Sequence, residues 1–212
     1  MCRRMLVRKM GLSDYRKTWA EMRRFTDERD ADTADELWLT EHEAVFTQGL
    51  NGRAEHLLSP GEIPVIQVDR GGQVTYHGPG QLVLYCLLDI LRLGIGVKGL
   101  VGRIEHSVIE LLGGYGIEAV TRPGAPGVYV DEAKVAALGL RIRKGCCYHG
   151  LSLNVDLDLE PFSRIDPCGF RGLAVTRLCD LGVGDSLQTV GDKLAAIMTE
   201  RLSEKKPGNT GR

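Results

Sequence analysis

The chain has 212 residues, and its 27 Lys and Arg residues nearly balance its 28 Asp and Glu residues, so its net charge is -1. Hydrophobic residues make up 43% of the sequence and charged residues 26%, a balance typical of a globular protein, and one that excludes disorder over most of the chain. The length favours a single domain over residues 1–212, and the even charge gives no support for a nucleic-acid partner.

The N-terminal third is expected to hold one helix followed by short strands. The first residues are basic but lack an apolar h-region, so we predict no signal peptide and a cytoplasmic location. A helix is predicted over 14–29, with Ser13 as its N-cap and with Tyr15, Trp19, Met22 and Phe25 on one face. Strands are predicted over 36–41, 44–47 and 64–69.

The central third contains the most apolar segment of the chain. The turn Gly78-Pro79-Gly80 predicts a strand pair, whose second strand, 81–90, is nearly all apolar and should be buried on both faces. Its apolar run, 82–88, is far shorter than the ~20 residues that cross a bilayer, so we predict no membrane partner. Apolar residues at helical spacing then predict a helix over 97–112, ended by Gly113 and Gly114.

The last third is expected to be mostly strands, with one closing helix. Strands are predicted over 127–130, 134–142 and 147–156, and a helix over about 190–202 with Thr189 and Asp192 as a capping box. The polar tail, 204–212, should be disordered. Many strands and few helices predict an α+β fold with a mixed, largely antiparallel sheet and packed helices.

Two motif-like patterns have simpler explanations. Residues 94–99 match GxGxxG, but the chain around them is not a series of βαβ units, so a glycine-rich loop is the better interpretation. Cys146, Cys147 and His149 lie close together, yet adjacent cysteines in a strand point to opposite faces and no CxxC or HxxxH spacing completes a metal site. We therefore expect neither a metal nor a dinucleotide, and the scattered cysteines should be reduced thiols.

The segment 70–81 concentrates polar side chains and glycines directly against buried strands. Glycines let a ligand approach the backbone, and Arg70, Thr75 and His77 would supply fixed donors and acceptors. A loop in which His77 satisfies a neighbouring carbonyl fits the same residues. The residues by themselves leave both interpretations open.

Cys168 and Lys134 are the residues most suggestive of covalent chemistry. Cys168 lies in a turn, Asp166-Pro167-Cys168-Gly169, that can present a thiol to a substrate. A nucleophilic thiol needs a nearby base or cation, because only a few per cent is ionised at an unperturbed pKa near ~8.5. Lys134 opens an apolar run where a charge requires a partner, although an exposed residue at a strand edge would also explain it.

These residues resemble the lipoyl(octanoyl) transferases of bacterial lipoate synthesis over nearly the whole chain. The family signature RGG-xx-T-aromatic-H-xx-G-Q-x-L-x-Y is met from Arg70 to Tyr85. Later blocks match at Lys134–Gly139, Tyr148–Asn154 and Pro167-Cys168-Gly169, and an earlier one at 36–42. Small departures occur at Glu43-Ala44, where the family often has prolines, and at 46–49.

The resemblance implies an acyltransferase with the fold of the biotin and lipoate protein ligase catalytic domains. It would move an octanoyl group from octanoyl-acyl carrier protein to a lysine of lipoyl domains in 2-oxoacid dehydrogenases and of the glycine cleavage H protein, as a cytoplasmic monomer with no cofactor. Cys168 would be the acyl-thioester nucleophile and Lys134 its activator, with His149 in support. The substrate pocket would comprise Arg70, Gly71, Gly72, Gln73, Val74, Thr75, Tyr76, His77, Ala137, Leu138, Gly139, Gly150, Leu151 and Ser152.

Two other functions remain open at this point. An ATP-dependent lipoate- or biotin-type ligase of the same fold would adenylate a free acid, but such an enzyme has no use for a nucleophilic Cys168. A non-catalytic acyl- or carrier-binding module would tolerate the loss of that cysteine without losing its role.

Overall fold

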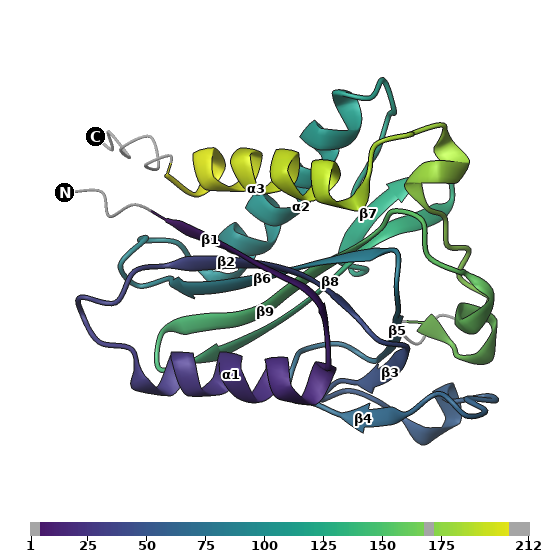
Figure 1. Cartoon of the computed structure of the whole chain (residues 1–212), viewed down its shortest axis with the longest axis horizontal. Coiled ribbons are helices and arrows are strands. Elements are labelled where there is room, and N and C mark those ends of the chain that lie inside the picture. The colour runs from purple at the N-terminus through teal and green to yellow at the C-terminus, as the bar shows by residue number, and fades with distance from the viewer. Residues whose placement is uncertain (1–4, 168–171, 204–212) are drawn as a thin grey trace.

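The computed structural model describes residues 5–167 and 172–203, which form two sheets and three α-helices (Figure 1). The strands are β1 (Leu6–Ser13), β2 (Glu36–His42), β3 (Val45–Gln48), β4 (Val65–Gln67), β5 (Val74–His77), β6 (Gln81–Asp89), β7 (Gly127–Val130), β8 (Ala133–Arg143) and β9 (Cys146–Asn154). The helices are α1 (Tyr15–Glu28), α2 (Val97–Gly113) and α3 (Leu187–Ser203).

The larger sheet has six strands in the order β1-β2-β6-β9-β8-β7. All neighbours in it are antiparallel except β1 and β2, which run parallel. The smaller sheet has the order β4-β3-β5, with β3 parallel to β4 and antiparallel to β5. The predicted α+β class with a mixed, largely antiparallel sheet is therefore confirmed.

Both faces of the larger sheet are covered by helices. Helices α2 and α3 lie over one face and α1 over the other (Figure 1). Side chains of β6 alternate accordingly, because Leu82 and Leu84 join the core under α2 and α3, whereas Val83 and Tyr85 join the one under α1. The prediction that 81–90 forms a strand buried on both faces is confirmed.

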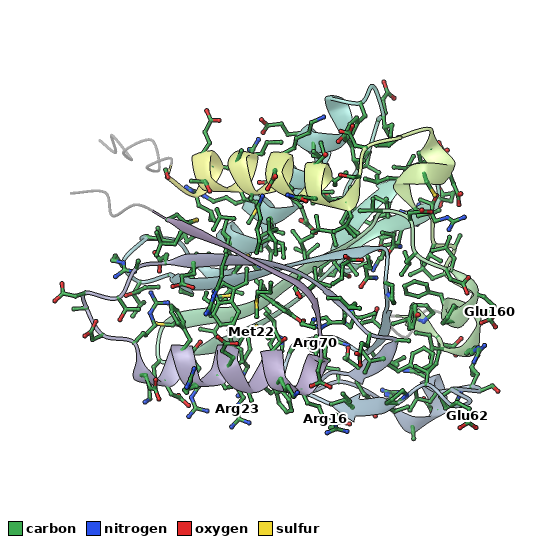
Figure 2. The ribbon with its side chains drawn as sticks, in the orientation of Figure 1. Arg16, Met22, Arg23, Glu62, Arg70 and Glu160 are labelled. Atoms are coloured by element: carbon green, nitrogen blue, oxygen red, sulfur yellow. The ribbon has the colours of Figure 1, made fainter. Side chains whose placement is uncertain are left out.

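Helix α1 begins one residue later than predicted, and its cap differs. Asp14, not Ser13, is the N-cap, and its carboxylate accepts a hydrogen bond from the Lys17 amide at 2.8 Å. Met22 points from α1 into the sheet, whereas Arg16 and Arg23 point away from it (Figure 2). The first turn of α1 also packs on the small sheet, since Tyr15 contacts the cluster that contains Val45.

The predicted strand pair around Gly78-Pro79-Gly80 is wrong. The strands on either side of this turn belong to different sheets, because β5 pairs with β3 and β6 pairs with β2 and β9. The Gly80 amide donates a hydrogen bond to the Glu41 carboxylate at 2.8 Å, which fixes the turn against the end of β2. Gly80 has a φ of +85°, and a Cβ there would lie 2.5 Å from the Asp156 carbonyl oxygen, so only glycine fits.

Two other features near the chain ends differ from the sequence expectation. Strand β1 was not predicted, because it is a largely exposed edge strand without an alternating apolar pattern. It is joined to α3 by an ion pair between Lys9 and Asp192 at 2.6 Å. Helix α3 starts earlier than predicted, and the Ser186 hydroxyl, in place of the Thr189–Asp192 capping box, accepts the Thr189 amide. The predicted tail, 204–212, lies outside the described residues.

No helix in the described ranges is both long enough and apolar enough to cross a lipid bilayer.

We predict that the attachment of α1 to the sheet contributes strongly to stability. Met22 is fully buried, so Met22→Ala should lower the free energy of unfolding by about 2–5 kcal/mol through lost burial and a residual cavity. Urea denaturation followed by circular dichroism measures this. Arg24→Ala, on the exposed side of the same helix, is the control and should change stability by less than ~0.5 kcal/mol. A loss below ~1 kcal/mol for Met22→Ala would contradict the packing described.

Candidate active site

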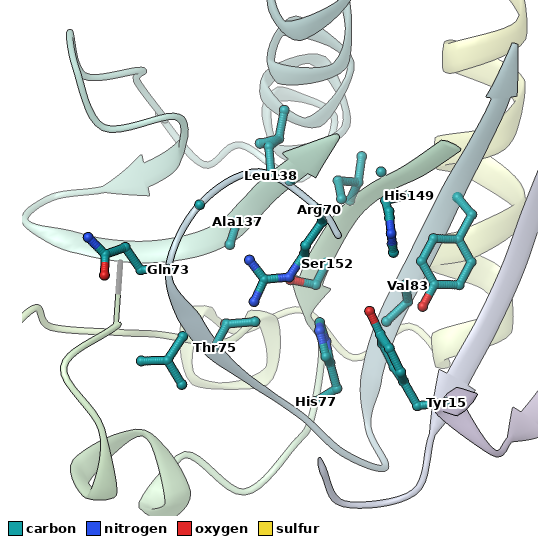
Figure 3. A pocket seen from close by; sticks show the side chains of 16 residues that line it. Tyr15, Arg70, Gln73, Thr75, His77, Val83, Ala137, Leu138, His149 and Ser152 are labelled. Carbon is teal, nitrogen blue, oxygen red and sulfur yellow. The ribbon is translucent and has the colours of Figure 1, made fainter. Parts of the chain in front are cut away.

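Five segments of the chain meet around one cavity of about 50 Å³ (Figure 3). They are the start of α1, the segment that runs from Arg70 into β5, and the middle parts of β6, β8 and β9. The predicted site residues that line it are Arg70, Gly72, Gln73, Val74, Thr75, His77, Ala137, Leu138, Gly139, Gly150, Leu151 and Ser152. Tyr15 and Gln73 lie at its opposite ends (Figure 3).

Two residues of the predicted substrate pocket lie outside this cavity. Tyr76 points to the other face of β5, where its ring packs between Phe46 and Phe162 in a separate hydrophobic cluster. Gly71 lines a neighbouring groove instead. Its amide donates to the Leu140 carbonyl at 2.9 Å, so it holds the loop against β8.

Arg70 is the anchor of the glycine loop. Its Nη2 donates to the Thr47 carbonyl at 2.7 Å and to the Thr47 hydroxyl at 2.9 Å, and its Nη1 donates to the Gly71 carbonyl at 3.0 Å. The aliphatic part of the Arg70 side chain lies over β8, since a Cβ added to Gly139 would lie 3.0 Å from Arg70 Cδ. Gly139, which has no side chain, therefore leaves room for the buried Arg70 over the sheet.

A chain of hydrogen bonds continues from Arg70 to His77. Since the Thr47 hydroxyl accepts from Arg70, its own proton is directed to His77 Nε2 at 3.3 Å. His77 Nδ1 then donates to the Gln81 side-chain oxygen at 2.7 Å. Burial lowers the pKa of His77 to about 3, and the nearby His42 adds to the effect, so His77 is neutral.

Next to His77 lies a second group of buried polar rings that the sequence did not point out as site residues. His42 Nδ1 donates to the Ser13 carbonyl at 3.0 Å, and its Nε2 accepts from the Tyr85 hydroxyl at 2.6 Å. Burial lowers the pKa of His42 to about 4 and raises that of Tyr15 to about 12. Tyr15 and Tyr85 line the cavity and are uncharged at neutral pH.

The sequence carried a signal for these residues, but only for their burial. Tyr15 was placed on the buried face of the first helix, and Tyr85 in a strand buried on both faces. A hydrophobic pattern reports that a side chain is inside and does not report that it borders a cavity.

His149 is held by Asp69 and adopts an uncommon backbone conformation. Asp69 accepts hydrogen bonds from His149 Nε2 at 2.9 Å, from Trp19 Nε1 at 2.8 Å and from the Tyr148 hydroxyl. Burial of Asp69 acts to raise its pKa, but these hydrogen bonds outweigh burial and lower the pKa overall. Because an ionised Asp69 only accepts, His149 carries its proton on Nε2. Burial lowers the pKa of His149, so the ring is neutral.

The backbone of His149 has a φ of +61°, inside a strand, where non-glycine residues rarely adopt the left-handed region. Its Nδ1 is buried and has no hydrogen-bond partner among the described residues. His149 itself lines the cavity. Strained backbone and an unsatisfied buried acceptor at a cavity wall are features that concentrate at functional sites.

Lys134 is buried, which decides between the two interpretations of its sequence position. Its side chain is in β8 and the residue is only 4% exposed. Its Nζ donates to the Pro126 carbonyl at 3.2 Å and lies 5.2 Å from the centre of the Tyr129 ring. Its backbone is fixed by Ala174 and Thr176, which bond to its amide and carbonyl at 2.8 and 3.0 Å.

A small cavity of about 10 Å³ connects Lys134 with the main one. It shares Thr75, Ala137 and Ser152 with the main cavity, and it is also lined by Lys134 and Pro167. Pro167 directly precedes Cys168 in the sequence. Cys168 itself, the predicted nucleophile, lies outside the described residues.

The four described cysteines are poor nucleophiles. Burial raises the pKa of Cys86 to about 12 and also raises the pKa values of Cys146 and Cys147. Burial, together with a hydrogen bond to the Asp156 carboxylate, raises the pKa of Cys179 to about 11. In the part of the chain that the structure describes, no group of three His, Cys, Asp or Glu side chains is arranged to hold a metal ion.

Comparison with known sequences gives consistent results. The family model for the lipoyl protein ligase A/B catalytic domain matches residues 14–199. An octanoyltransferase of Stutzerimonas stutzeri is 62% identical over 196 residues, which cover 92% of this chain and 90% of that protein. An octanoyltransferase of Alkalilimnicola ehrlichii is 58% identical over 205 residues, which cover 97% of this chain and 94% of the relative.

Solved structures share the fold at low sequence identity. A crystal structure of lipoate-protein ligase A bound with ATP superposes with a TM-score of 0.76 at 19% identity, covering 95% of this chain and 86% of the ligase. The biotin protein ligase of Aquifex aeolicus gives a TM-score of 0.55 at 16% identity, covering 95% of this chain and 69% of the ligase. The expected likeness to the biotin and lipoate ligase fold is therefore confirmed.

We predict that the neutral histidines make stability depend on pH. Folding lowers the pKa of these histidines, so protonation at low pH favours the unfolded state. The protein therefore loses stability as the pH falls from about 6.5, the pKa of histidine in the unfolded chain, towards the pKa in the folded protein, which is about 4 for His42. Between pH 7 and pH 5 the His42→Gln variant should therefore lose about 2 kcal/mol less stability than the unsubstituted protein. Urea denaturation at both pH values measures the difference, and equal losses would show that His42 is not held neutral. His106→Gln, on the exposed side of α2, is the control.

Proposed function

Because this chain belongs to the family of lipoyl protein ligase A/B catalytic domains, and its relatives at 58% and 62% identity are octanoyltransferases, we propose that it transfers octanoyl groups in protein lipoylation. The chain is an acyltransferase of that kind. The position of Lys134 supports the assignment of roles to specific residues. Lys134 is buried and lines one small cavity together with residues of the main cavity and with Pro167, the residue that precedes Cys168 in the sequence.

The proposed donor is octanoyl-acyl carrier protein, and the proposed acceptors are lipoyl domains of 2-oxoacid dehydrogenases and the glycine cleavage H protein. The relatives' names support an octanoyl donor, and the family model supports lipoyl-domain acceptors in general. We further propose that residues 1–212 act as one catalytic domain, as a monomer, in the cytoplasm and without a cofactor.

In the first half-reaction, Cys168 attacks the donor as a thiolate. Lys134 supplies a positive charge that raises the thiolate fraction of this cysteine. A bond forms between the cysteine sulfur and the octanoyl carbon, the bond from that carbon to the carrier sulfur breaks, and the carrier thiolate leaves and takes up a proton. One thioester replaces another, so this step needs no external energy source.

The main cavity would receive the acyl chain. Its described lining includes the apolar side chains of Val74, Val83, Leu138 and Leu151. Burial contributes about 0.8 kcal/mol for each methylene removed from water, so a chain of octanoyl length gains several kcal/mol. The polar rings that border the cavity are neutral, so they do not add the cost of desolvating a charge.

In the second half-reaction, the acceptor lysine attacks the thioester as a neutral amine. A bond forms from its nitrogen to the octanoyl carbon, the bond to Cys168 breaks, and the proton of the amine passes to the enzyme. Once acylated, Cys168 carries no negative charge, so Lys134 can give its proton to the departing carrier thiolate and then, as a neutral amine, accept the proton of the acceptor lysine. Formation of an amide from a thioester makes this step favourable overall.

We predict that incubation with octanoyl-acyl carrier protein adds one octanoyl mass to the protein, and that the adduct maps to Cys168. Cys168→Ala should abolish both the adduct and transfer to a lipoyl domain, because the proposed thioester forms on the Cys168 sulfur. Intact-protein and peptide mass spectrometry measure this. Cys179→Ser is the matched control and should keep full activity, since the Cys179 thiol is protonated at neutral pH.

Transfer at an unchanged rate by Cys168→Ala would exclude the covalent route. ATP consumption with free octanoate would instead identify a ligase, and retention of donor binding without any transfer would identify a binding module.

A separate prediction concerns Lys134. Lys134→Arg keeps the charge but does not readily give up a proton, so it should still form the acyl-enzyme while slowing transfer by about 100-fold or more. Lys134→Ala should slow both steps and move the pH profile of acylation upwards. Single-turnover assays of each half-reaction between about pH 6 and 9 measure this. Acylation of Lys134→Ala with an unshifted profile would remove Lys134 as the activator and make His77 or His149 the better candidate.

A further inference from the structure

A second, larger cavity opens from the site towards the surface. It is a groove of about 470 Å³ formed by the glycine loop, β8, the first turns of α2 and the segment 124–126. It shares Gly72, Gln73, Leu138 and Gly139 with the main cavity, and Lys134 with the small one. The groove therefore borders the main cavity and reaches Lys134, the proposed activator.

The side chains that line this groove are almost all uncharged. Its described lining residues are Asn51, Gly71, Gly72, Gln73, Val97, Val101, Gly124, Ala125, Pro126, Lys134, Leu138, Gly139 and Leu140. Of these, Lys134 alone has a charged side chain, whereas charged residues make up 26% of the whole sequence. The described lining offers valine and leucine side chains, two amide side chains and the backbone of several glycines.

Part of the backbone that lines the groove borders open space, although Gly71 is already paired through both its amide and its carbonyl. A Cβ added to Gly124 would meet no atom within 4 Å, so the space over its backbone is open. Gly72 has a φ of +88°, and its added Cβ would approach only the Arg70 side chain, at 3.4 Å. Peptide N–H and C=O groups that border an open groove pair well with the amides of a bound chain.

We propose that this groove binds the thioester-bearing arm of the acyl donor, a linear and uncharged chain with amide groups such as pantetheine. This inference rests on the proposed function and adds to it the site through which the donor reaches Cys168. The arm lies with its amides against the glycine backbone and its methyl groups against Val97 and Val101, and its thioester end lies at Lys134.

Charge distinguishes this occupant from the acceptor. The lysine of a lipoyl domain carries an ammonium group until it reacts, and an ammonium is stabilised by carboxylates. The described lining of the groove contains no carboxylate that would stabilise an ammonium. A neutral arm needs no such partner.

The test uses S-octanoyl pantetheine as the donor and follows acylation in single turnovers. Val97 is 44% exposed on the groove, so Val97→Trp should fill the groove and raise the half-saturating donor concentration about tenfold, with folding preserved. Val65→Trp is the matched control, since Val65 is 36% exposed and lines none of the cavities described, and it should leave this concentration unchanged. Transfer from a preformed acyl-enzyme to a lipoyl domain should be unchanged in both variants.

Two results would overturn the inference: unchanged half-saturation for Val97→Trp, or a loss confined to the transfer step, which would assign the groove to the acceptor. A failure of the unsubstituted protein to form any acyl-enzyme would instead contradict the proposed function. In that case methyl NMR with unacylated pantetheine decides the inference. Shifts at Val97 and Val101 but not at Val65 support it, and their absence rejects it.

Discussion

The rest of the structure depends on two central strands, β6 and β9, that are buried on both faces. Helices cover both sides of β6 and β9, so every polar side chain on these strands must find its partner within the protein. Gln81 shows the result, because it accepts from His77 and donates to Asn154 on the neighbouring strand. The same requirement keeps the histidines neutral, since burial lowers their pKa values. A dry sheet therefore produces a site whose polar groups are fixed and mostly uncharged.

The two cationic side chains at the site, Arg70 and Lys134, both donate hydrogen bonds to backbone carbonyl oxygens. Arg70 is surrounded by the carbonyls of Thr47 and Gly71, and Lys134 donates to the carbonyl of Pro126. Carbonyl oxygens offset part of the cost of burying a charge without neutralising it.

The sequence predicted those parts of the fold that local pattern determines. The apolar run of β6 could only be a buried strand, whereas the residues from Arg70 to His77 by themselves left a ligand site and a simple loop both open. A Gly-Pro-Gly turn reads the same whether the strands beside it pair or separate, so the separation of β5 from β6 was missed. Strand β1 was missed because an exposed edge strand needs no apolar alternation. From the residues alone, Lys134 could equally be exposed, and only the family resemblance pointed to its role.

The link between the two sheets has an evolutionary consequence. Only three residues separate His77, which lines the cavity, from Gln81, the first residue of β6. The last of the three, Gly80, is fixed by the hydrogen bond from its amide to the Glu41 carboxylate. Side chains alternate along a strand, so one inserted or deleted residue here would turn Thr75 and His77 away from the cavity and Tyr76 into it. Loops elsewhere on the surface can change length without such a penalty. Homologues of this chain should therefore vary in loop length around the site while the spacing between these two strands stays constant.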